Sequence, residues 1–212
     1  MSSLVDVTGF ILKGGIVSIE LFAITAVLSV PLGMLVAMGK ISKNKILNSV
    51  LGFYTWSFRG TPLLLQLFFI YFGLPAFNIR LDSMVAASLA FVLNYAAYLA
   101  EIFRSGILSV DPGQMEAAKA LGMTYNQAML RIIAPQAFKN VVPSVCSESV
   151  ILIKDTALVA VIGVGDLLRA AKEVVMNDFT IYPFFIAGLV YLILSTLLVM
   201  VFNKIEKRYS AY

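Results

Sequence analysis

The sequence predicts an all-α membrane protein with five transmembrane helices, and three observations support this fold class. Of the 212 residues, 60% are hydrophobic and only 13% are charged, and the mean hydropathy is +0.90. Soluble domains carry about 25% charged residues, so this chain has too few polar side chains to cover a soluble core. Its apolar runs are continuous, which favours helices over the alternating strands of a barrel, the other structure that can span lipid.

Five apolar segments are predicted to cross the membrane. They are Gly15–Gly39, Phe53–Pro75, Ser83–Ile107, Asn140–Val164 and Ile181–Asn203. Each has about 20 residues or more, which is enough to cross a hydrocarbon core of about 30 Å. Before the first of them, Val5–Leu12 is expected to form a short interfacial helix. Because the sequence contains no long linker or low-complexity tract, residues 1–212 are predicted to form a single membrane domain.

The basic residues of the connecting segments predict the orientation. Eleven lysines and arginines fall on the side of the first loop, the third loop and the C-terminal tail, against four on the opposite side. Cytoplasmic loops carry the excess of basic residues in membrane proteins. The N-terminus is therefore predicted to lie outside and the C-terminus in the cytoplasm, which agrees with an odd number of spans.

Composition and motifs exclude most enzymatic chemistry. The chain has no histidine and a single cysteine, Cys146, so histidine-based catalysis, a histidine metal site and an intrachain disulfide are all excluded. No Walker, GxSxG, HExxH or GxGxxG pattern occurs. We therefore predict a chain that is not an enzyme and holds no metal or cofactor of its own.

The loop at 111–135, on the predicted cytoplasmic side, is expected to form a helix–Gly–helix element. Asp111 can cap its first helix, Pro112 suits the first helical position, and Gln114 completes a capping-box-like arrangement. Gly122 is placed to end that helix in a left-handed turn.

A second helix is predicted to follow at once. Thr124 and Gln127 have the spacing of a capping box, and Pro135 lies near the end of this helix. Long loops with their own structure are usually functional. The alternative is a helical linker that only connects two spans.

The order of residues in this loop resembles a known signature. Glu116-Ala117-Ala118, then Gly122, then Ile132 and Pro135 are similar to the EAA motif of bacterial ABC-importer permeases. Ala134 stands where that motif usually has leucine.

Other segments are similar to the polar amino-acid subfamily of these permeases. They are Phe58–Leu64 (FRGTPLL), Ala97–Arg104 (AYLAEIFR) and Lys154–Thr156 (KDT). The chain departs from the family pattern at Asn94–Ala97, where smaller residues are usual, and at Ser147, where asparagine is common.

The resemblance implies an importer that works by alternating access in the bacterial inner membrane. Its partners would be a second permease subunit, two ATP-binding subunits that hold ATP and magnesium, and an extracytoplasmic solute-binding protein. The loop would dock on the ATP-binding subunit through Glu116, Ala117, Ala118 and Gly122. Whether the two permease subunits are identical stays open.

Polar residues within the spans are candidates for the substrate site. Gln66, Asn94 and Glu148 lie near mid-depth, where transporter sites tend to be found. Interhelical hydrogen bonding is the alternative and is the favoured interpretation of Gln66. Neighbouring candidates on the same helices are Tyr98, Ser144 and Ser147. Glu101 and Arg104 are one turn apart and are predicted to form a structural ion pair instead.

The charge at mid-depth indicates the class of substrate. Glu148 has no basic residue at its own predicted depth, so a cationic substrate would supply its counter-ion. This favours a basic amino acid, arginine, lysine or histidine. The alternatives are a neutral polar amino acid such as glutamine, whose α-ammonium group would bind Glu148, and an ion channel, for which the loop would have no use.

Overall fold

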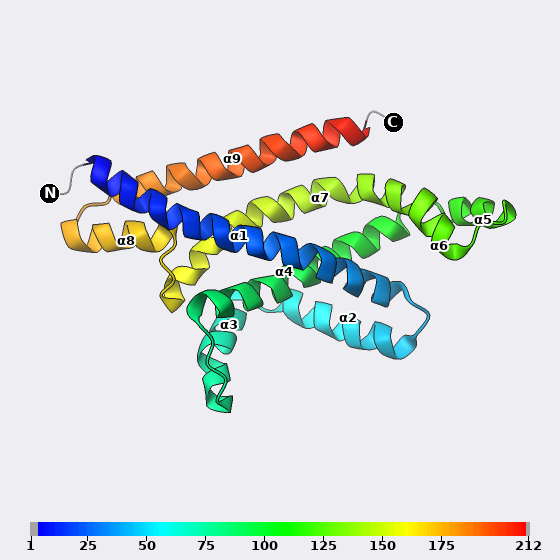
Figure 1. The fold of residues 1–212 in the computed structure, drawn as a ribbon, viewed down its shortest axis with the longest axis horizontal. Coiled ribbons are helices and arrows are strands. Elements are labelled where there is room, and N and C mark those ends of the chain that lie inside the picture. The colour runs from blue at the N-terminus through cyan, green and yellow to red at the C-terminus, as the bar shows by residue number, and fades with distance from the viewer. Residues whose placement is uncertain (1–3, 211–212) are drawn as a thin grey trace.

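The computed structural model describes residues 4–210, and this part of the chain contains helices and no strand. The α-helices are α1 (Leu4–Ile41), α2 (Lys45–Gly60), α3 (Leu63–Phe68), α4 (Ser83–Leu108), α5 (Pro112–Ala120), α6 (Tyr125–Ala128), α7 (Ala134–Asp155), α8 (Leu167–Asp178) and α9 (Tyr182–Ser210). Short π and 3-10 segments are η1 (Phe69–Gly73), η2 (Leu74–Phe77), η3 (Met129–Ile133) and η4 (Thr156–Ile162). The long helices lie along one axis of the molecule, as Figure 1 shows.

Within the described residues, three helices are long and apolar enough to cross a membrane, α1, α4 and α9, and the bent pair formed by α2 and α3–η2 brings the number to four if it counts as one span. The remaining predicted span, Asn140–Val164, corresponds to most of α7 together with η4, and the residues of α7 are more mixed in polarity. The all-helical fold class is therefore confirmed, and the count of five spans stays a prediction. Val5–Leu12 does not form a separate helix, because α1 runs without a break from Leu4 to Ile41.

The second predicted span, Phe53–Pro75, was wrong as a single helix. Asn44 caps α2 by accepting hydrogen bonds from the amides of Ile46 (3.0 Å) and Leu47 (3.2 Å). The helix ends at Gly60, and Thr61 is extended at φ −120° and ψ 144°. Thr61 precedes Pro62, and a residue before proline avoids the helical region of φ and ψ. The helix therefore cannot continue through Thr61. The chain resumes as α3 after a bend of 105°.

Small residues bring α1 and α4 together along much of their length. A Cβ atom added at Gly33 would lie 2.9 Å from the Cβ of Leu99 and 3.1 Å from the carbonyl oxygen of Ala96. The buried face of α4 is rich in alanine, namely Ala86, Ala87, Ala90, Ala96, Ala97 and Ala100. In membranes, where the hydrophobic effect does not drive helices together, such close approach supplies van der Waals contact.

The loop after α4 contains the helix–Gly–helix element. The Asp111 carboxylate accepts a bond from the Gly113 amide (2.7 Å), so it caps α5. Gln114 does not complete a capping box; its side-chain oxygen accepts a bond from Gln136 instead (3.4 Å). Gly122 has a φ of +77°, the left-handed turn that its position predicts.

The second helix of this loop is not a separate element. Thr124 and Gln127 form the reciprocal capping box, but α6, η3 and α7 then follow one another directly. Pro135 lies in the first turn of α7, where a missing amide hydrogen has the least effect. A movement of α5 and α6 can therefore be transmitted directly into α7.

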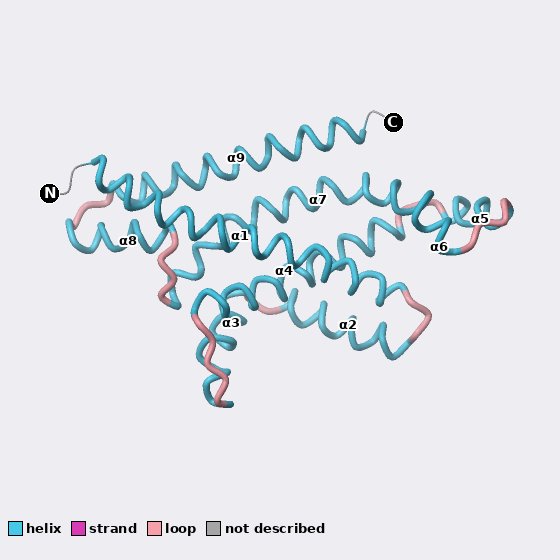
Figure 2. Tube along the Cα trace, in the orientation of Figure 1, coloured by secondary structure: helices cyan, strands magenta, loops and turns pink. Residues whose placement is uncertain are grey.

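The two ends of the bundle differ, as Figures 1 and 2 show. At one end lie α5, α6 and the turn between α1 and α2, here named the α5–α6 end. At the other lie the start of α1 and α8, here named the α8 end. There the buried carboxylate of Asp166 caps α8 by accepting bonds from the amides of Leu168 (3.0 Å) and Arg169 (3.1 Å).

Candidate functional site

Two amide side chains, those of Gln66 and Asn94, stabilise the break between α2 and α3 by hydrogen bonding. The Gln66 side-chain nitrogen donates to the carbonyl oxygens of Phe58 (2.9 Å) and Thr61 (3.1 Å) and to the Thr61 hydroxyl (2.8 Å). The Asn94 side-chain nitrogen donates to the same Phe58 carbonyl (3.1 Å) and to the Gln66 side-chain oxygen (3.0 Å). The last carbonyls of α2 have no partner inside the helix. Gln66 and Asn94 therefore satisfy backbone groups that the break exposes within the protein.

A cavity of about 250 Å³, here named the substrate cavity after the role that we propose for it, lies beside this break. Its polar lining consists of Thr61, Asn94, Tyr95, Tyr98, Glu148 and Asp155, and Pro62, Leu63 and Ile151 complete it. The residues come from α2–α3, α4 and α7, so three elements distant in sequence meet here. Irregular backbone within a membrane protein usually lines such a cavity.

Two carboxylates of α7 line the substrate cavity. Glu148 and Asp155 are seven residues apart and therefore lie on one face of the helix, about two turns from each other. The Tyr95 hydroxyl donates to a carboxylate oxygen of Asp155 at 2.8 Å. Glu148 forms no ion pair of 4 Å or less among the residues that the structure describes. The lining of this cavity therefore contains two acidic side chains and, in the described part of the chain, no basic one.

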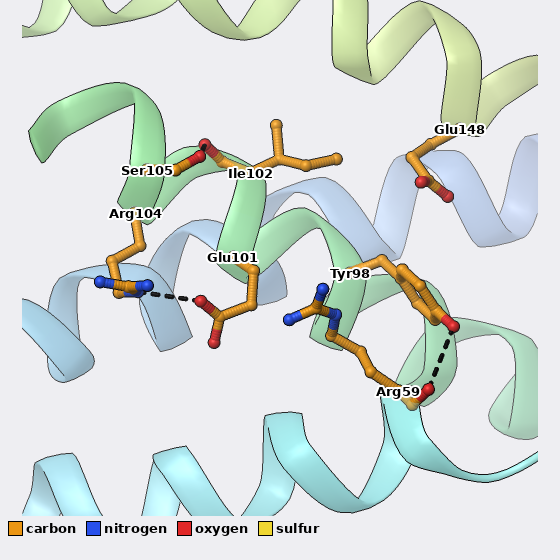
Figure 3. A pocket seen from close by; sticks show the side chains of 7 residues that line it. All are labelled: Arg59, Tyr98, Glu101, Ile102, Arg104, Ser105 and Glu148. Atoms are coloured by element: carbon orange, nitrogen blue, oxygen red, sulfur yellow. Dashed lines mark hydrogen bonds and ion pairs between the residues drawn. The ribbon is translucent and has the colours of Figure 1, made fainter. Parts of the chain in front are cut away.

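A second cavity of about 350 Å³, here named the arginine cavity, adjoins the first and shares Tyr98 and Glu148 with it. Its other lining residues are Arg59, Glu101, Ile102, Arg104 and Ser105. The last four belong to the later turns of α4, so this cavity lies nearer the α5–α6 end. Figure 3 shows the Arg59 side chain projecting into it from α2, and Glu148 pointing in from the opposite side.

Tyr98 lines both cavities and contacts Arg59 twice. Its hydroxyl donates to the Arg59 carbonyl oxygen (3.3 Å), and its ring lies 5.4 Å from the central guanidinium carbon of Arg59. The sequence predicts no basic residue at the depth of Glu148, but in the structure Arg59 lines the same cavity as Glu148.

Glu101 and Arg104 lie at one wall of the arginine cavity and pair as their spacing predicts. The Arg104 Nε atom is 2.9 Å from a carboxylate oxygen of Glu101. The other oxygen of Glu101 pairs with Lys40 of α1 and accepts a bond from the Thr55 hydroxyl of α2 (3.0 Å). Lys40 also donates to Thr55 (2.6 Å). This cluster joins three helices, and its charges are satisfied within the chain.

The predicted site residues separate into two groups. Asn94, Tyr98 and Glu148 line the substrate cavity. Ser144 and Ser147 are exposed and line neither of the two cavities. The Ser147 hydroxyl donates to the Pro143 carbonyl (3.1 Å) within α7 instead.

Sequence reasoning missed three residues of the site. Asp155 was not among the predicted site residues, and Thr61 and Arg59 lie at the break that an unbroken second span does not contain. The signal for the break was present, because Gly60 and Pro62 flank Thr61 within five residues of Gln66. Gln66 follows this Gly60–Pro62 pair closely, so its side chain can form hydrogen bonds with the carbonyl groups that the break leaves without helical partners.

The predicted docking residues of the loop also differ in accessibility. Glu116, Ala117 and Gly122 are exposed. Ala118 has an exposed fraction of 0%, so its side chain cannot meet a partner protein. Its methyl group faces inward and lets α5 lie close to the rest of the loop. The prediction that Ala118 contacts the ATP-binding subunit is therefore wrong for its side chain, because that side chain is buried within the permease.

Known proteins resemble the chain over almost its whole length. Residues 29–211 match the family described as "Binding-protein-dependent transport system inner membrane component". The arginine transport system permease ArtQ of Bacillus subtilis (strain 168) is 40% identical over 201 residues, covering 94% of this chain and 92% of that protein. A protein of Rickettsia prowazekii (strain Madrid E), GlnP, named provisionally for glutamine transport, is 41% identical over 201 residues with the same coverage.

A solved structure agrees with the fold. The crystal structure of an amino acid ABC transporter with histidines superimposes with a TM-score of 0.91 at 36% identity and covers 97% of both chains. Family, relatives and fold together confirm the resemblance carried by the EAA loop and the FRGTPLL segment. The chain therefore belongs to the binding-protein-dependent transport system inner membrane components, as a permease of the polar amino-acid type of ABC transporter.

Proposed function

We propose that this permease imports a basic L-amino acid by alternating access, and that the substrate cavity binds it. One observation carries the proposal: two carboxylates, Glu148 and Asp155, line a cavity of about 250 Å³. A basic amino acid has two cationic groups, its α-ammonium and its side chain. Each could pair with one carboxylate, and such charge-assisted hydrogen bonds are the stronger ones in proteins.

The two carboxylates have different surroundings, which suggests different roles. Asp155 accepts a hydrogen bond from Tyr95 at 2.8 Å, so its orientation is fixed. It suits the α-ammonium group, which every amino acid presents in the same way. Glu148 has a longer side chain and lies where the two cavities meet, which suits a cationic side chain of variable length.

A neutral polar amino acid is the second candidate. Arg59 faces Glu148 across the arginine cavity, and a cation already present there lessens the advantage of a cationic substrate. The relative GlnP, 41% identical, is named for glutamine, whereas ArtQ, 40% identical, is named for arginine. We favour the basic substrate because the substrate cavity itself holds two carboxylates.

The α5–α6 end is proposed to face the cytoplasm and an ATP-binding subunit. Lys43, Lys45, Lys119 and Arg131 lie at this end, as the positive-inside rule requires. Exposed side chains of the loop, including Leu121 at 80% and Tyr125 at 51%, leave apolar surface available there. ATP and magnesium would be bound by that partner, and this chain would supply no catalytic group.

The test is amino-acid binding to the purified permease assembled with its ATP-binding subunits. We expect L-arginine, L-lysine or L-histidine to bind more tightly than L-glutamine. Glu148→Gln should weaken binding of the basic ligand by about tenfold or more, since a charge-assisted bond is lost. Glu20→Gln is the matched control, because Glu20 is exposed on α1 and lines neither cavity.

Two results would contradict the proposal. One is tighter binding of glutamine than of all three basic amino acids, which would favour the second candidate. The other is a Glu148→Gln variant that binds the basic ligand as tightly as the unsubstituted protein, which would make Glu148 structural.

A further inference from the structure

A further cavity of about 470 Å³, here named the apolar cavity, lies between α1, α4, η3 and α7. Every residue that lines it is apolar, which distinguishes it from the substrate cavity and the arginine cavity. On α1 its lining residues are Val30, Met34 and Met38, which follow one helix face for about 12 Å. A lining without polar groups cannot satisfy the charges of an amino acid, so the proposed function leaves this cavity unused.

The apolar cavity opens on the outer surface of the helices. Met34, Leu130 and Phe138 are among its lining residues, and all three are exposed. Met38 and Met129 line it as well, and methionine side chains adapt to apolar ligands of irregular shape. An exposed apolar surface of this kind marks contact with a membrane or with another protein. The occupant of the cavity is therefore apolar where it enters.

Positive charge lies where the apolar cavity approaches the α5–α6 end. Arg131 precedes Ala134 by three residues and Phe138 by seven, so it lies close to the helix face that lines the cavity. It is exposed and forms no ion pair among the residues that the structure describes. On the opposite side, the exposed Lys43 follows Met38 by five residues, in the turn after α1. A cation is thus available on each side.

The chain segments on both sides of the apolar cavity are basic and contain no acidic residue. Residues 21–60 contain three lysines and one arginine, residues 125–147 contain one of each, and neither segment contains aspartate or glutamate. Of these basic residues, Lys40 is paired with Glu101 of α4. Basic pockets between membrane helices bind the head groups of anionic lipids. An apolar cavity with a basic end is therefore complementary to a molecule with an apolar chain and an anionic head.

We propose that the apolar cavity binds an anionic phospholipid of the surrounding membrane, with an acyl chain in the cavity and the head-group phosphate on Arg131 and Lys43. A second copy of the chain suits the cavity less well, because a symmetric contact would place these basic residues against the same residues of the copy. The bound lipid would join α1 to η3 and α7, the helices that connect the loop to Glu148. The site is independent of which amino acid the permease transports.

The test measures phospholipid binding to the purified, delipidated complex with its ATP-binding subunits, by native mass spectrometry. The probes are dioleoyl phosphatidylglycerol and dioleoyl phosphatidylcholine, which have the same acyl chains and differ in net charge. The unsubstituted complex should prefer phosphatidylglycerol by roughly 5- to 30-fold, as expected for one or two basic residues near a lipid head group. Arg131→Gln should reduce the preference about fivefold. Lys204→Gln, an exposed cation near the end of α9, is the matched control and should keep it.

Two further measurements distinguish the cavity from the basic surface beside it. Ala134→Phe places a ring in the cavity and should weaken binding of both lipids, whereas Arg131→Gln should weaken phosphatidylglycerol alone. If Ala134→Phe does not assemble, Met34→Trp fills the cavity from α1 and takes its place. Glycerol 3-phosphate carries the charge of the head group without acyl chains, and it should not compete with phosphatidylglycerol.

Several results would overturn the inference. One is equal binding of the two lipids by the unsubstituted complex, and another is a full preference retained by Arg131→Gln. Unchanged phosphatidylglycerol binding after the cavity is filled would place the lipid elsewhere, and competition by glycerol 3-phosphate would indicate a site for a free anion. Binding of neither lipid would show that another protein chain covers the cavity. The proposed function survives each of these results, because it rests on other residues.

Discussion

Single residues in this protein decide whether charge can be held inside the membrane domain. Lys40 and Glu101 have side chains only 12% and 15% exposed, and neither would be stable alone in such surroundings. Glu101 accepts bonds from Lys40, Arg104 and Thr55, so its carboxylate is fully used. Arg104, with a side chain 35% exposed, can still reach solvent. The cluster depends on Glu101 because it is the acceptor that all three donors share.

Replacing Glu101 with glutamine is expected to destabilise the protein strongly. The substitution leaves Lys40 buried without a counter-ion, and breaking a buried ion pair in this way costs about 3–5 kcal/mol. Thermal unfolding in detergent should show the loss as a lower midpoint. The double substitution Lys40→Met with Glu101→Leu should recover much of it, because both buried charges are then removed. If Glu101→Gln unfolds at the same temperature as the unsubstituted protein, the cluster does not hold the three helices together.

At the scale of elements, the approach of α1 to α4 depends on one missing side chain. An added Cβ at Gly33 would come within 2.9 Å of the Leu99 Cβ and 3.2 Å of the Ala100 amide nitrogen. Neither atom lies at the end of a flexible side chain, so the helices would have to separate. In α1 itself, Gly9 offers the opposite case, with no atom within 4 Å of its added Cβ.

We therefore expect opposite results from two alanine substitutions in the same helix. Gly33→Ala should destabilise the protein by about 1–3 kcal/mol, as overpacking of a tight core does. Gly9→Ala should be neutral or slightly stabilising, because alanine has the higher helix propensity. The midpoint of thermal unfolding in detergent measures both. Equal effects at the two positions would show that propensity, and not the contact with α4, governs this helix.

The elements also show what the sequence can and cannot predict. The predicted span Ser83–Ile107 agrees closely with α4, Ser83–Leu108. The helix follows a long apolar segment of the sequence, with Asp82 as its N-cap and Ser109 as its C-cap. The caps of Asp111 and Thr124 were predicted because capping is local. The break at Thr61 has a local signal in Gly60 and Pro62, but the bond that stabilises it from Asn94 to the Phe58 carbonyl joins residues 36 positions apart and could not be predicted. Likewise, the distance of 61 residues hid the pairing of Lys40 with Glu101.

At the scale of the whole molecule, the continuous run from α6 to α7 connects the loop to the site. The loop packs on the ends of α4 and α7 through a cluster of buried apolar residues that includes Val110, Met129 and Ile133. About four turns beyond Ile133, α7 carries Glu148 into both cavities. A force on α5 can therefore reach the candidate substrate site through packed helix rather than through a flexible linker, which is what coupling to an ATP-binding partner requires.

A docking test must separate contact with that partner from damage to the loop itself. Gly122 suits the test poorly when replaced by glutamate, because its φ of +77° strains most side chains, and Ala118 is buried. Ala117 is exposed within α5, where glutamate is a good helix former. Ala117→Glu should therefore leave the permease folded. Ala76→Glu, an exposed position in η2 away from α5 and α6, is the matched control.

Ala117→Glu is expected to reduce both co-purification of the ATP-binding subunit and amino-acid uptake by reconstituted vesicles, by about tenfold or more if a charge is forced into a close interface. Ala76→Glu should leave the co-purified amount unchanged. Gly122→Asn should also retain the subunit, because asparagine tolerates the left-handed conformation. If Ala117→Glu transports and co-purifies like the unsubstituted protein, this exposed face of α5 does not dock on the partner, and the link from the loop through α7 to Glu148 must then begin elsewhere.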